Sequence, residues 1–231
     1  MNTVAVTGSA SGLGYVIASR LAAEGHDLIL VDRDSAGLVR AAEKVRNDHA
    51  VAVETLTGDL STNSGIESVA ADLQRFGNLI ALVNNAGGWS PGAQYPVAAE
   101  DVWMSAMTLN LLAPMALTQR LWSALAHRSG AVINIGSSGG IGDESYGSPE
   151  YGAAKAGVRR FTASLGSRED VRVMAIVPGW IGLERARAEF AQLSVFEQQC
   201  RGPLIPPTAI ADTIVDLLRR GLAGDVVELL G

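Results

Sequence analysis

The sequence predicts a single α/β domain over residues 1–231, built on a doubly wound parallel sheet of about seven strands with helices on both faces. Three observations support this fold class. Short apolar runs rich in β-branched residues alternate with stretches of helical periodicity along the whole chain. No internal repeat, low-complexity tract or linker interrupts this alternation, and 231 residues suit one domain. The apolar run at residues 79–84 is typical of a parallel strand that is covered on both faces.

Strands and helices are expected to follow one another in βα order. The strands are predicted at residues 3–7, 27–32, 51–56, 79–84, 131–135, 171–177 and 226–230. The helices are predicted after the first strand, ending at Gly25, and then at residues 35–47, 62–76, 98–126, from 149 onward and at 208–222. The helix at 62–76 carries a capping-box pattern, Ser64-x-x-Glu67. The segment at about 182–203 mixes polar and apolar residues and is predicted to form a small mobile lid.

Charge and composition argue against several classes of protein. The net charge is −6 and no basic stripe occurs, so nucleic acid and anionic membranes are not expected as partners. Cys200 is the single cysteine, which excludes an internal disulfide framework and fits a reducing, cytoplasmic location. The chain enters a strand almost at once, which leaves no room for a signal peptide, and no metal site is predicted. The uncharged stretch between Asp101 and Arg120 is interrupted by polar residues and a proline, so it is interpreted as a buried or subunit-interface helix.

A glycine-rich turn follows the first strand and contains Gly8, Gly12 and Gly14. Strand, glycine turn and helix form the first half of a Rossmann-type dinucleotide-binding unit, in which a pyrophosphate approaches the helix N-terminus. This spacing also fits an ordinary βα turn. Asp32 favours the first interpretation, because it ends the second strand 18 residues beyond Gly14, where a ribose-binding carboxylate belongs. Its carboxylate is expected to repel a 2′-phosphate and favour NAD, while Arg33 keeps NADP open as an alternative.

Tyr151 and Lys155 are predicted to form the chemical centre. They stand four residues apart on one expected helix, so they share a face one turn from each other. A phenol has an unperturbed pKa of about 10, and a neighbouring ammonium lowers that pKa by stabilising the phenolate. Such a tyrosine can act as a general acid and base. Ser138, upstream on a different element, could donate a hydrogen bond to the same substrate oxygen. The alternative is a solvated helix face, since a Tyr-x-x-x-Lys match is common by chance.

Taken together, the motifs resemble those of the short-chain dehydrogenase/reductase family over almost the whole chain. Each motif is weak alone, but six or seven in register are specific. Many members of the family have a threonine shortly after the Pro-Gly pair, and this chain has none there, so backbone groups of Ile181 are expected to take its place. The matching pieces, in the family's order, are Thr7-Gly8-x-x-x-Gly12-x-Gly14, Asp59, Asn84-Asn85-Ala86-Gly87, Asn110, Ser138, Tyr151-x-x-x-Lys155 and Pro178-Gly179.

The resemblance implies a role for each matching residue. Tyr151 would exchange a proton with the substrate hydroxyl or carbonyl, and Ser138 would hold that oxygen. Lys155 would lower the pKa of Tyr151 and hold the nicotinamide ribose. Ser137 is the weaker candidate, because neighbours on a strand point to opposite faces. The residues implied to bind the cofactor are Gly8, Ser11, Gly12, Leu13, Gly14, Asp32, Arg33, Asp59, Leu60, Asn85, Ala86, Gly87, Tyr151, Lys155, Pro178, Gly179 and Ile181.

Asn110 is a further catalytic candidate because of the proline four residues later. Pro114 has no N–H and cannot bond the carbonyl of Asn110 in the usual helical way. A freed carbonyl inside a protein needs another partner, commonly an ordered water. In the family, that carbonyl and water link to the catalytic lysine and carry protons to solvent. The alternative is a helix kink made for packing. For Asn84, a purely structural role that braces the central strands is a strong alternative.

Three aromatic residues are predicted to wall a substrate pocket together with Ser138. Trp89 and Trp180 follow the carboxyl ends of strands, where ligands bind in an open α/β sheet, and Tyr146 lies in the loop before Tyr151. Three rings around the oxygen-binding pair predict an apolar or ring-bearing substrate of modest size rather than a polyol. Packing beneath the lid is the alternative role for these rings.

The predicted function is an NAD(P)-dependent oxidoreductase that interconverts a secondary alcohol and a ketone. One alternative is a β-ketoacyl reductase, against which the chain lacks an obvious basic cluster for an acidic carrier protein. Another is a non-catalytic dinucleotide-sensing protein, which would need neither Tyr151 nor Lys155. Nucleotide-sugar epimerases and dehydratases generally carry a larger substrate domain than this chain can supply. The uncharged face around Trp103, Met107, Leu111 and Leu117 predicts a homo-oligomer, with a tetramer of two-fold symmetry favoured over a dimer.

Overall fold

The structure is a computed structural model that describes residues 2–89, 91–142 and 145–230. A seven-stranded sheet runs in the order β3-β2-β1-β4-β5-β6-β7, and every neighbouring pair is parallel. The order reverses between β1 and β4, and ligands bind outside the carboxyl ends of the strands at such a switch point. The strands are β1 (Thr3–Thr7), β2 (Asp27–Asp32), β3 (Val53–Thr57), β4 (Leu79–Asn84), β5 (Ala131–Ile135), β6 (Arg172–Pro178) and β7 (Val226–Leu229).

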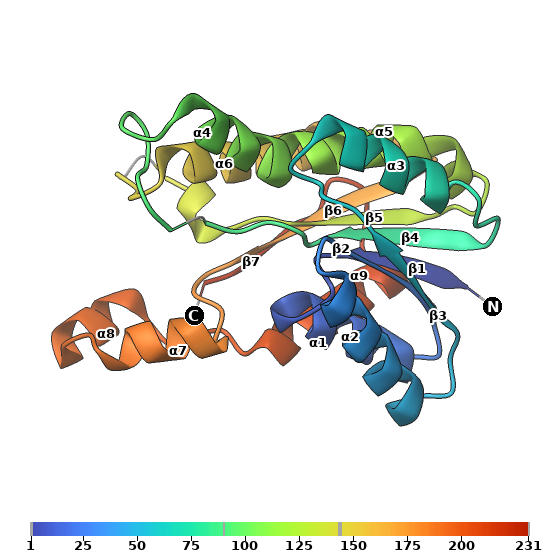
Figure 1. Ribbon diagram of the computed structural model, residues 1–231, viewed down its shortest axis with the longest axis horizontal. Coiled ribbons are helices and arrows are strands. Elements are labelled where there is room, and N and C mark those ends of the chain that lie inside the picture. The colour runs from blue at the N-terminus through green and yellow to red at the C-terminus, as the bar shows by residue number, and fades with distance from the viewer. Residues whose placement is uncertain (1, 90, 143–144, 231) are drawn as a thin grey trace.

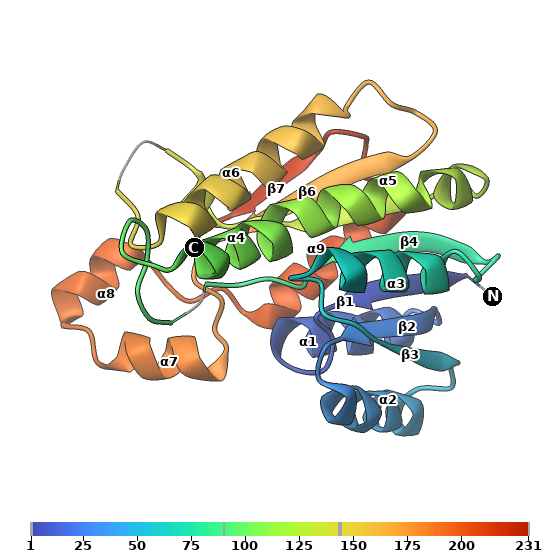
Figure 2. The ribbon, with the colours of Figure 1, turned by 45° about the horizontal axis from the view of Figure 1, so that its top comes forward.

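Helices cover both faces of this sheet, which confirms the predicted fold class (Figures 1 and 2). Alternate strand residues enter opposite apolar cores: Val4 and Val6 pack toward one face, and Ala5 packs toward the other. The helices α3 (Asn63–Leu73), α4 (Glu100–Met107), α5 (Ala113–Ala126) and α6 (Pro149–Ser164) lie on one face, and α1 (Gly12–Ala23), α2 (Ser35–Asp48) and α9 (Pro207–Arg220) lie on the other.

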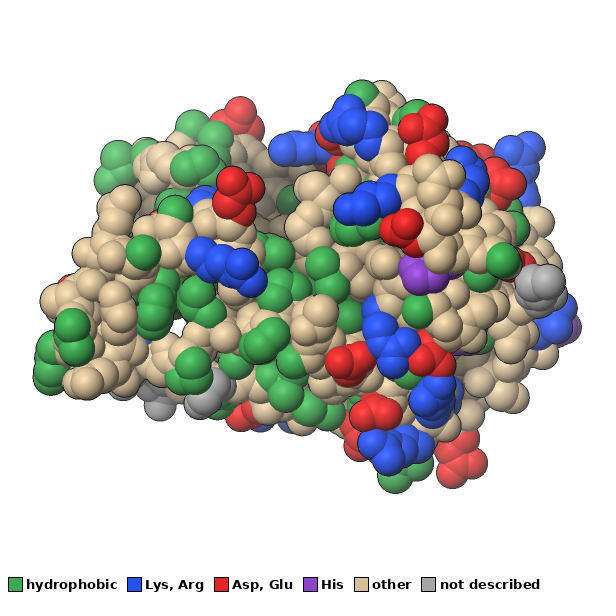
Figure 3. Space-filling model, turned by 90° about the horizontal axis from the view of Figure 1, so that it is seen from below, with side chains coloured by type: hydrophobic (Ala, Val, Ile, Leu, Met, Phe, Trp, Pro, Cys, Tyr) green, Lys and Arg blue, Asp and Glu red, His purple; other side chains and the backbone are tan. Residues whose placement is uncertain are grey.

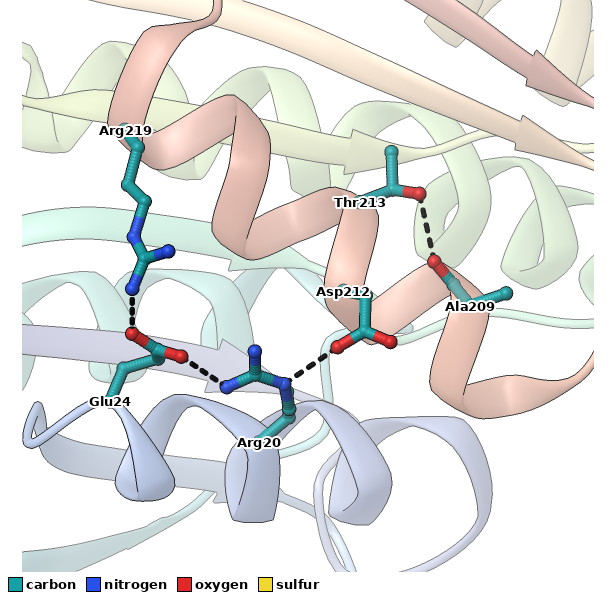
Figure 4. A network of polar contacts seen from close by, with 6 residues as sticks. All are labelled: Arg20, Glu24, Ala209, Asp212, Thr213 and Arg219. Atoms are coloured by element: carbon teal, nitrogen blue, oxygen red, sulfur yellow. Dashed lines mark hydrogen bonds and ion pairs between the residues drawn. The ribbon is translucent and has the colours of Figure 1, made fainter.

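A polar network joins α1 to α9 at the surface (Figure 4). The Arg20 Nε donates to an Asp212 carboxylate oxygen at 2.6 Å, and the Glu24 carboxylate pairs with both Arg20 and Arg219. These groups lie at the surface, where solvent screens their charges, so each pair contributes little to stability. The apolar side of α9, which includes the buried Ile210, carries most of the packing. The network therefore serves mainly to fix the position of α9 on α1.

The helix predicted at residues 98–126 is interrupted by one wide turn. Between α4 and α5 the chain forms a π-helical turn at Thr108–Leu112, and the Ala113 N–H bonds the Thr108 carbonyl five residues earlier. Pro114, which has no N–H, lies directly after this turn. Within the described part of the chain, no helix is both long enough and apolar enough to span a membrane.

One further local prediction is corrected by the structure. The cap of α3 is Thr62, whose hydroxyl accepts the Gly65 N–H at 3.1 Å, so the capping box predicted at Ser64 and Glu67 is wrong. A capping box occurs instead at Ser194 and Glu197.

The segment predicted as a lid contains α7 (Glu184–Ala191) and α8 (Val195–Arg201), which project beyond the sheet (Figure 1). Seen from below in Figure 3, apolar side chains gather on the side of these two helices, and charged ones gather mostly on the side of α1, α2 and α9. Both ends of the segment are pinned together, because Ile181 forms a bridge with Ile205 and the Ile205 N–H bonds the Trp180 carbonyl at 2.7 Å.

Candidate active site

The turn after β1 brings two stretches of backbone into close contact. The Thr7 hydroxyl accepts the N–H groups of Asn85 and Ala86 at 3.0 and 2.9 Å, and the Asn85 amide donates to the carbonyls of Thr7 and Gly8. A Cβ at Gly14 would lie 2.0 Å from the Gly8 carbonyl oxygen, and Gly8 itself has a φ of 66°. Only glycine fits these two positions, so the sequence pattern reflects a close approach of the α1 N-terminus to the switch point.

Two cavities open at the carboxyl ends of the strands and share Gly8 and Gly87. The larger measures about 420 Å³ and the smaller about 220 Å³. Of the sequence-predicted residues, the larger is lined by Gly8, Ser11, Gly12, Leu13, Gly14, Asn85, Gly87, Trp89, Tyr146, Tyr151, Lys155, Pro178, Gly179, Trp180 and Ile181, and the smaller by Gly8, Asp32, Arg33, Asp59, Leu60, Ala86 and Gly87.

The smaller cavity carries two carboxylates and one guanidinium. Asp32 ends β2, and its oxygens accept the N–H groups of Ala10 at 3.0 Å and Asp34 at 3.1 Å. Asp59 accepts both the N–H and the hydroxyl of Ser61, and these hydrogen bonds lower the pKa of Asp59. Both carboxylates are thus held in place by neighbouring donors, and the cavity has a negative balance beside Arg33.

Tyr151 and Lys155 lie on α6 and both line the larger cavity. Lys155 is buried and donates from Nζ to the Ile135 carbonyl at 2.9 Å, and burial lowers the pKa of Lys155 to about 8. Burial also raises the pKa of Tyr151, and a hydrogen bond with Ser137 acts in the opposite direction. The Lys155 ammonium lies 5.6 Å from the centroid of the Tyr151 ring. The predicted lowering of the Tyr151 pKa by Lys155 is therefore not found in this structure, because desolvation outweighs the other contributions.

The structure places Ser137, rather than Ser138, in the lining of the larger cavity. Ser137 favours a lower pKa of Tyr151, whereas Ser138 is not among the described lining residues and begins a short 3-10 turn at Ser138–Gly140. The strand β5 has already ended at Ile135, so the alternation of faces along a strand does not extend to the serine pair. The Ser137 hydroxyl also accepts the Gly139 N–H at 3.2 Å, which fixes its position.

Asn110 lies outside both cavities but holds their shared wall. Its buried side chain accepts the Gly88 N–H at 2.9 Å and donates to the carbonyls of Gly88 and Ala106. A Cβ at Gly87 would lie 2.6 Å from the Asn110 Oδ1 and 3.3 Å from the Lys155 Nζ. The π-helical turn thus directs the side chain of Asn110 at the segment that faces Lys155. Asn84 braces the sheet instead, because its amide donates to the Asn134 Oδ1 at 2.9 Å.

Aromatic rings from three elements surround the mouth of the larger cavity. Tyr146 stacks on Tyr151 with ring centroids 6.0 Å apart, and Trp180 contacts Phe190 of α7 edge-on at 6.3 Å. Trp89 is 37% exposed, so part of its ring remains open to the cavity. The sequence-predicted aromatic residues therefore do share one cavity with Tyr151.

A sequence model of the short chain dehydrogenases matches residues 2–193. The chain belongs to this family. The acetoacetyl-CoA reductase of Shinella zoogloeoides is 36% identical over 79% of this chain and 75% of its own length. The L-sorbose reductase of Gluconobacter frateurii, solved with NADPH and L-sorbose, is 26% identical, covers 100% of this chain and 95% of its own, and superposes with a TM-score of 0.88. The bulky-bulky ketone specific alcohol dehydrogenase of Comamonas testosteroni is 25% identical, covers 99% and 86% of the two chains, and has a TM-score of 0.82.

This short-chain dehydrogenase is thus an oxidoreductase of a family that uses NAD(P). Its own residues fit a dinucleotide, because the two cavities share Gly8 and Gly87 in their lining and the backbone N–H groups at the start of α1 face the larger one. Within the described residues, no cluster of three or more His, Cys, Asp or Glu side chains could hold a metal ion.

Sequence reasoning missed several residues of the site. Thr7 stands in the first matching motif but was given no role, and the structure shows that its hydroxyl holds the switch-point backbone. Arg185 and Glu189 line the cavity from α7. They lie in the predicted lid, shortly after Pro178-Gly179, but no motif pointed to these two side chains. A second guanidinium, that of Arg201, lies 4.5 Å from the centroid of the Trp180 ring. The site therefore has basic groups at its mouth that the sequence did not reveal.

Proposed function

We propose that this short-chain dehydrogenase interconverts a secondary alcohol and a ketone, with Tyr151 as general acid and base. The observation that carries the proposal is the convergence of Tyr151, Lys155 and Ser137 on one cavity next to the glycine cradle. When bound, the nicotinamide supplies or accepts the hydride. The chain's own residues then have to bind the substrate oxygen, move its proton and exclude water.

Tyr151 is suited to give up a proton to the substrate oxygen. Because burial raises its pKa, the phenol stays protonated at neutral pH and can donate as a ketone is reduced. Ser137, rather than Ser138, is proposed to hold the substrate oxygen, because Ser137 lines the cavity together with Tyr151. Lys155 is positioned by the Ile135 carbonyl to stabilise the phenolate that forms, and it would hold the nicotinamide ribose. Asn110 acts as a positioning residue through Gly88, and the water relay from its backbone carbonyl stays a prediction.

We further propose NAD as the preferred cofactor, with NADP as the alternative. Asp32 would accept the adenosine ribose hydroxyls, and its charge opposes a 2′-phosphate in a cavity that already contains Asp59. The NADPH in the L-sorbose reductase structure belongs to that relative. Asp32→Ala is expected to lower the ratio of kcat/KM with NAD to kcat/KM with NADP by about tenfold or more. The reason is that the variant loses the repulsion between this carboxylate and the 2′-phosphate. A wild-type enzyme that prefers NADP would contradict this assignment.

The substrate is proposed to be apolar or ring-bearing, because Trp89, Trp180 and Tyr146 wall the cavity. A panel of ketones and alcohols, followed by nicotinamide absorbance, tests both the reaction and this preference. Cyclic and aryl ketones are expected to exceed open-chain polyols in kcat/KM, and Trp89→Ala should reduce that difference without weakening cofactor binding. A panel in which no ketone or alcohol is turned over would overturn the proposed reaction.

A β-ketoacyl reductase is the second candidate, and one observation favours it. Arg185 lines the cavity and Arg201 lies over the Trp180 ring, so a basic surface there could meet an acidic carrier. The Shinella relative is named as an acetoacetyl-CoA reductase. Acetoacetyl-CoA included in the panel separates the two candidates. We also propose a cytoplasmic location and a homo-oligomer, for which the exposed apolar side chains of α4 and α5 are the support.

A further inference from the structure

One guanidinium reaches the catalytic cavity from the projecting helices. Arg185, in the first turn of α7, lines the cavity, and its Cζ lies 5.2 Å from the centroid of the Trp89 ring. This cation–π contact joins the α7 side of the cavity to the segment after β4. The guanidinium therefore stands over an aromatic wall rather than pointing away from the site.

The hydrogen-bonding capacity of Arg185 is only partly used. Its Nε pairs with the Glu189 carboxylate at 3.3 Å, and within the described residues its two terminal nitrogens make no other hydrogen bond. A guanidinium presents its donors as a planar fork, which matches a carboxylate in a bidentate manner. With 62% of the Arg185 side chain exposed, the side chain has room to turn this free edge toward a ligand.

Among the described charged side chains that line the cavity, Arg185 is the cation with exposed hydrogen-bond donors. Lys155 is buried and already donates to Ile135, and the only carboxylate among the described lining residues is Glu189, which Arg185 itself neutralises. Arg201 adds positive charge next to Trp180, on the same side of the site. The mouth of the cavity is thus aromatic and cationic, while its inner end holds Tyr151 and Ser137.

We propose that Arg185 binds a carboxylate carried by the substrate, so that the preferred substrates are cyclic or aryl keto acids and the matching hydroxy acids. The ketone oxygen would lie at Tyr151 and Ser137, the ring against Trp89, and the carboxylate on the free edge of Arg185. This inference rests on the proposed ketone reductase activity, and it adds the substrate's charge.

The test compares an aryl keto acid with its neutral ester. We would measure kcat/KM for 4-acetylbenzoate and for methyl 4-acetylbenzoate in the wild type, R185Q, R185K, E189Q and the control R187Q. Arg187 lies on the same helix, is exposed and does not line the cavity. A charge-assisted bidentate contact predicts an acid-to-ester ratio above one in the wild type and a tenfold to hundredfold lower ratio in R185Q, as an order of magnitude.

The other variants separate recognition from a structural role. R185K should retain part of the ratio, R187Q should keep the wild-type ratio, and E189Q should raise the ratio because it removes the competing carboxylate. If the enzyme reduces both compounds but R185Q has the same acid-to-ester ratio of kcat/KM as the wild type, the carboxylate site is overturned. The ketone reductase proposal would still stand. If neither these compounds nor the ketones of the wider panel are turned over by the wild type, the proposed function itself fails.

Discussion

Burial acts in opposite directions on the two central side chains of α6. It raises the pKa of Tyr151 and lowers the pKa of Lys155, so each group is pushed toward its neutral form. Ser137 is the neighbour that favours the charged form of the tyrosine. At the scale of single residues, burial therefore has the largest effect on the pKa of both side chains.

Replacing each of the two serines by alanine in turn tests which of them holds the substrate oxygen. Ser137→Ala should lower kcat/KM for a ketone by about 10², the usual scale of help from a positioned polar group. Ser138→Ala should stay within roughly threefold of the wild type, because this serine begins the 3-10 turn outside the cavity. Steady-state kinetics with one ketone would measure both, and the opposite order of effects would restore Ser138.

The lowered pKa of Lys155 predicts a pH-dependent contribution to stability. Between about pH 8 and its ordinary value of 10.5, the lysine is neutral in the folded state and charged in the unfolded state. The unfolded state then binds more protons, so the free energy of unfolding rises with pH in this window, by roughly 3 kcal/mol in total. Below about pH 8 Lys155 is charged in both the folded and the unfolded state, so the folded state bears the full cost of burying the charged lysine. Urea unfolding of the wild type and Lys155→Met at several pH values should show this rise in the wild type alone, and parallel curves would refute it.

At the scale of elements, the π-helical turn and the pinned base of the projecting helices shape the site. The wide turn before Pro114 places the Asn110 side chain in hydrogen-bond contact with Gly88. The regular helix predicted at residues 98–126 did not indicate this contact. The bridge between Ile181 and Ile205 gives α7 and α8 a common base beside the cavity. Arg185 of α7 lies over the Trp89 ring beside this base. Hinge motion of the segment stays a prediction.

The sequence predicted these elements unevenly, for physical reasons. Four strands were placed at their observed bounds, because a strand buried on both faces is a short apolar run with clear ends. The wide turn at Thr108–Leu112 and the Thr62 cap depend on backbone bonds that several side chains can satisfy, so the pattern did not indicate them. The weaker rank given to Ser137 assumed that β5 reaches the serine pair, but β5 ends at Ile135. Arg185 was missed because tertiary packing brings its side chain of α7 to the cavity.

At the scale of the whole molecule, the apolar surface of α4 and α5 bears on assembly. Leu117, which was predicted to face a partner, is fully buried in the core of its own chain. Met104, Leu112 and Met115 are exposed instead, at 50%, 48% and 37%. A face of this kind is typical of an interface between copies with two-fold symmetry.

Light scattering at micromolar concentration should give a multiple of the 24.1 kDa chain mass. Leu112→Glu would place a charge in the predicted interface and should shift the mass toward that of the monomer. Leu222→Glu is the control, because Leu222 is 70% exposed and lies outside this face. A wild type that is monomeric, or equal masses for both variants and the wild type, would contradict the predicted assembly.

The central claim is that the Tyr151 hydroxyl moves the substrate proton, and Tyr151→Phe tests it most directly because it removes that oxygen and little else. With a ketone from the panel and the preferred cofactor, kcat should fall by roughly 10² or more, the usual scale of general acid-base catalysis. The Kd of the cofactor, measured by fluorescence titration, should stay within about threefold, because Lys155 and the glycine cradle are unchanged. A Tyr151→Phe enzyme that keeps a substantial fraction of the wild-type kcat would contradict the account.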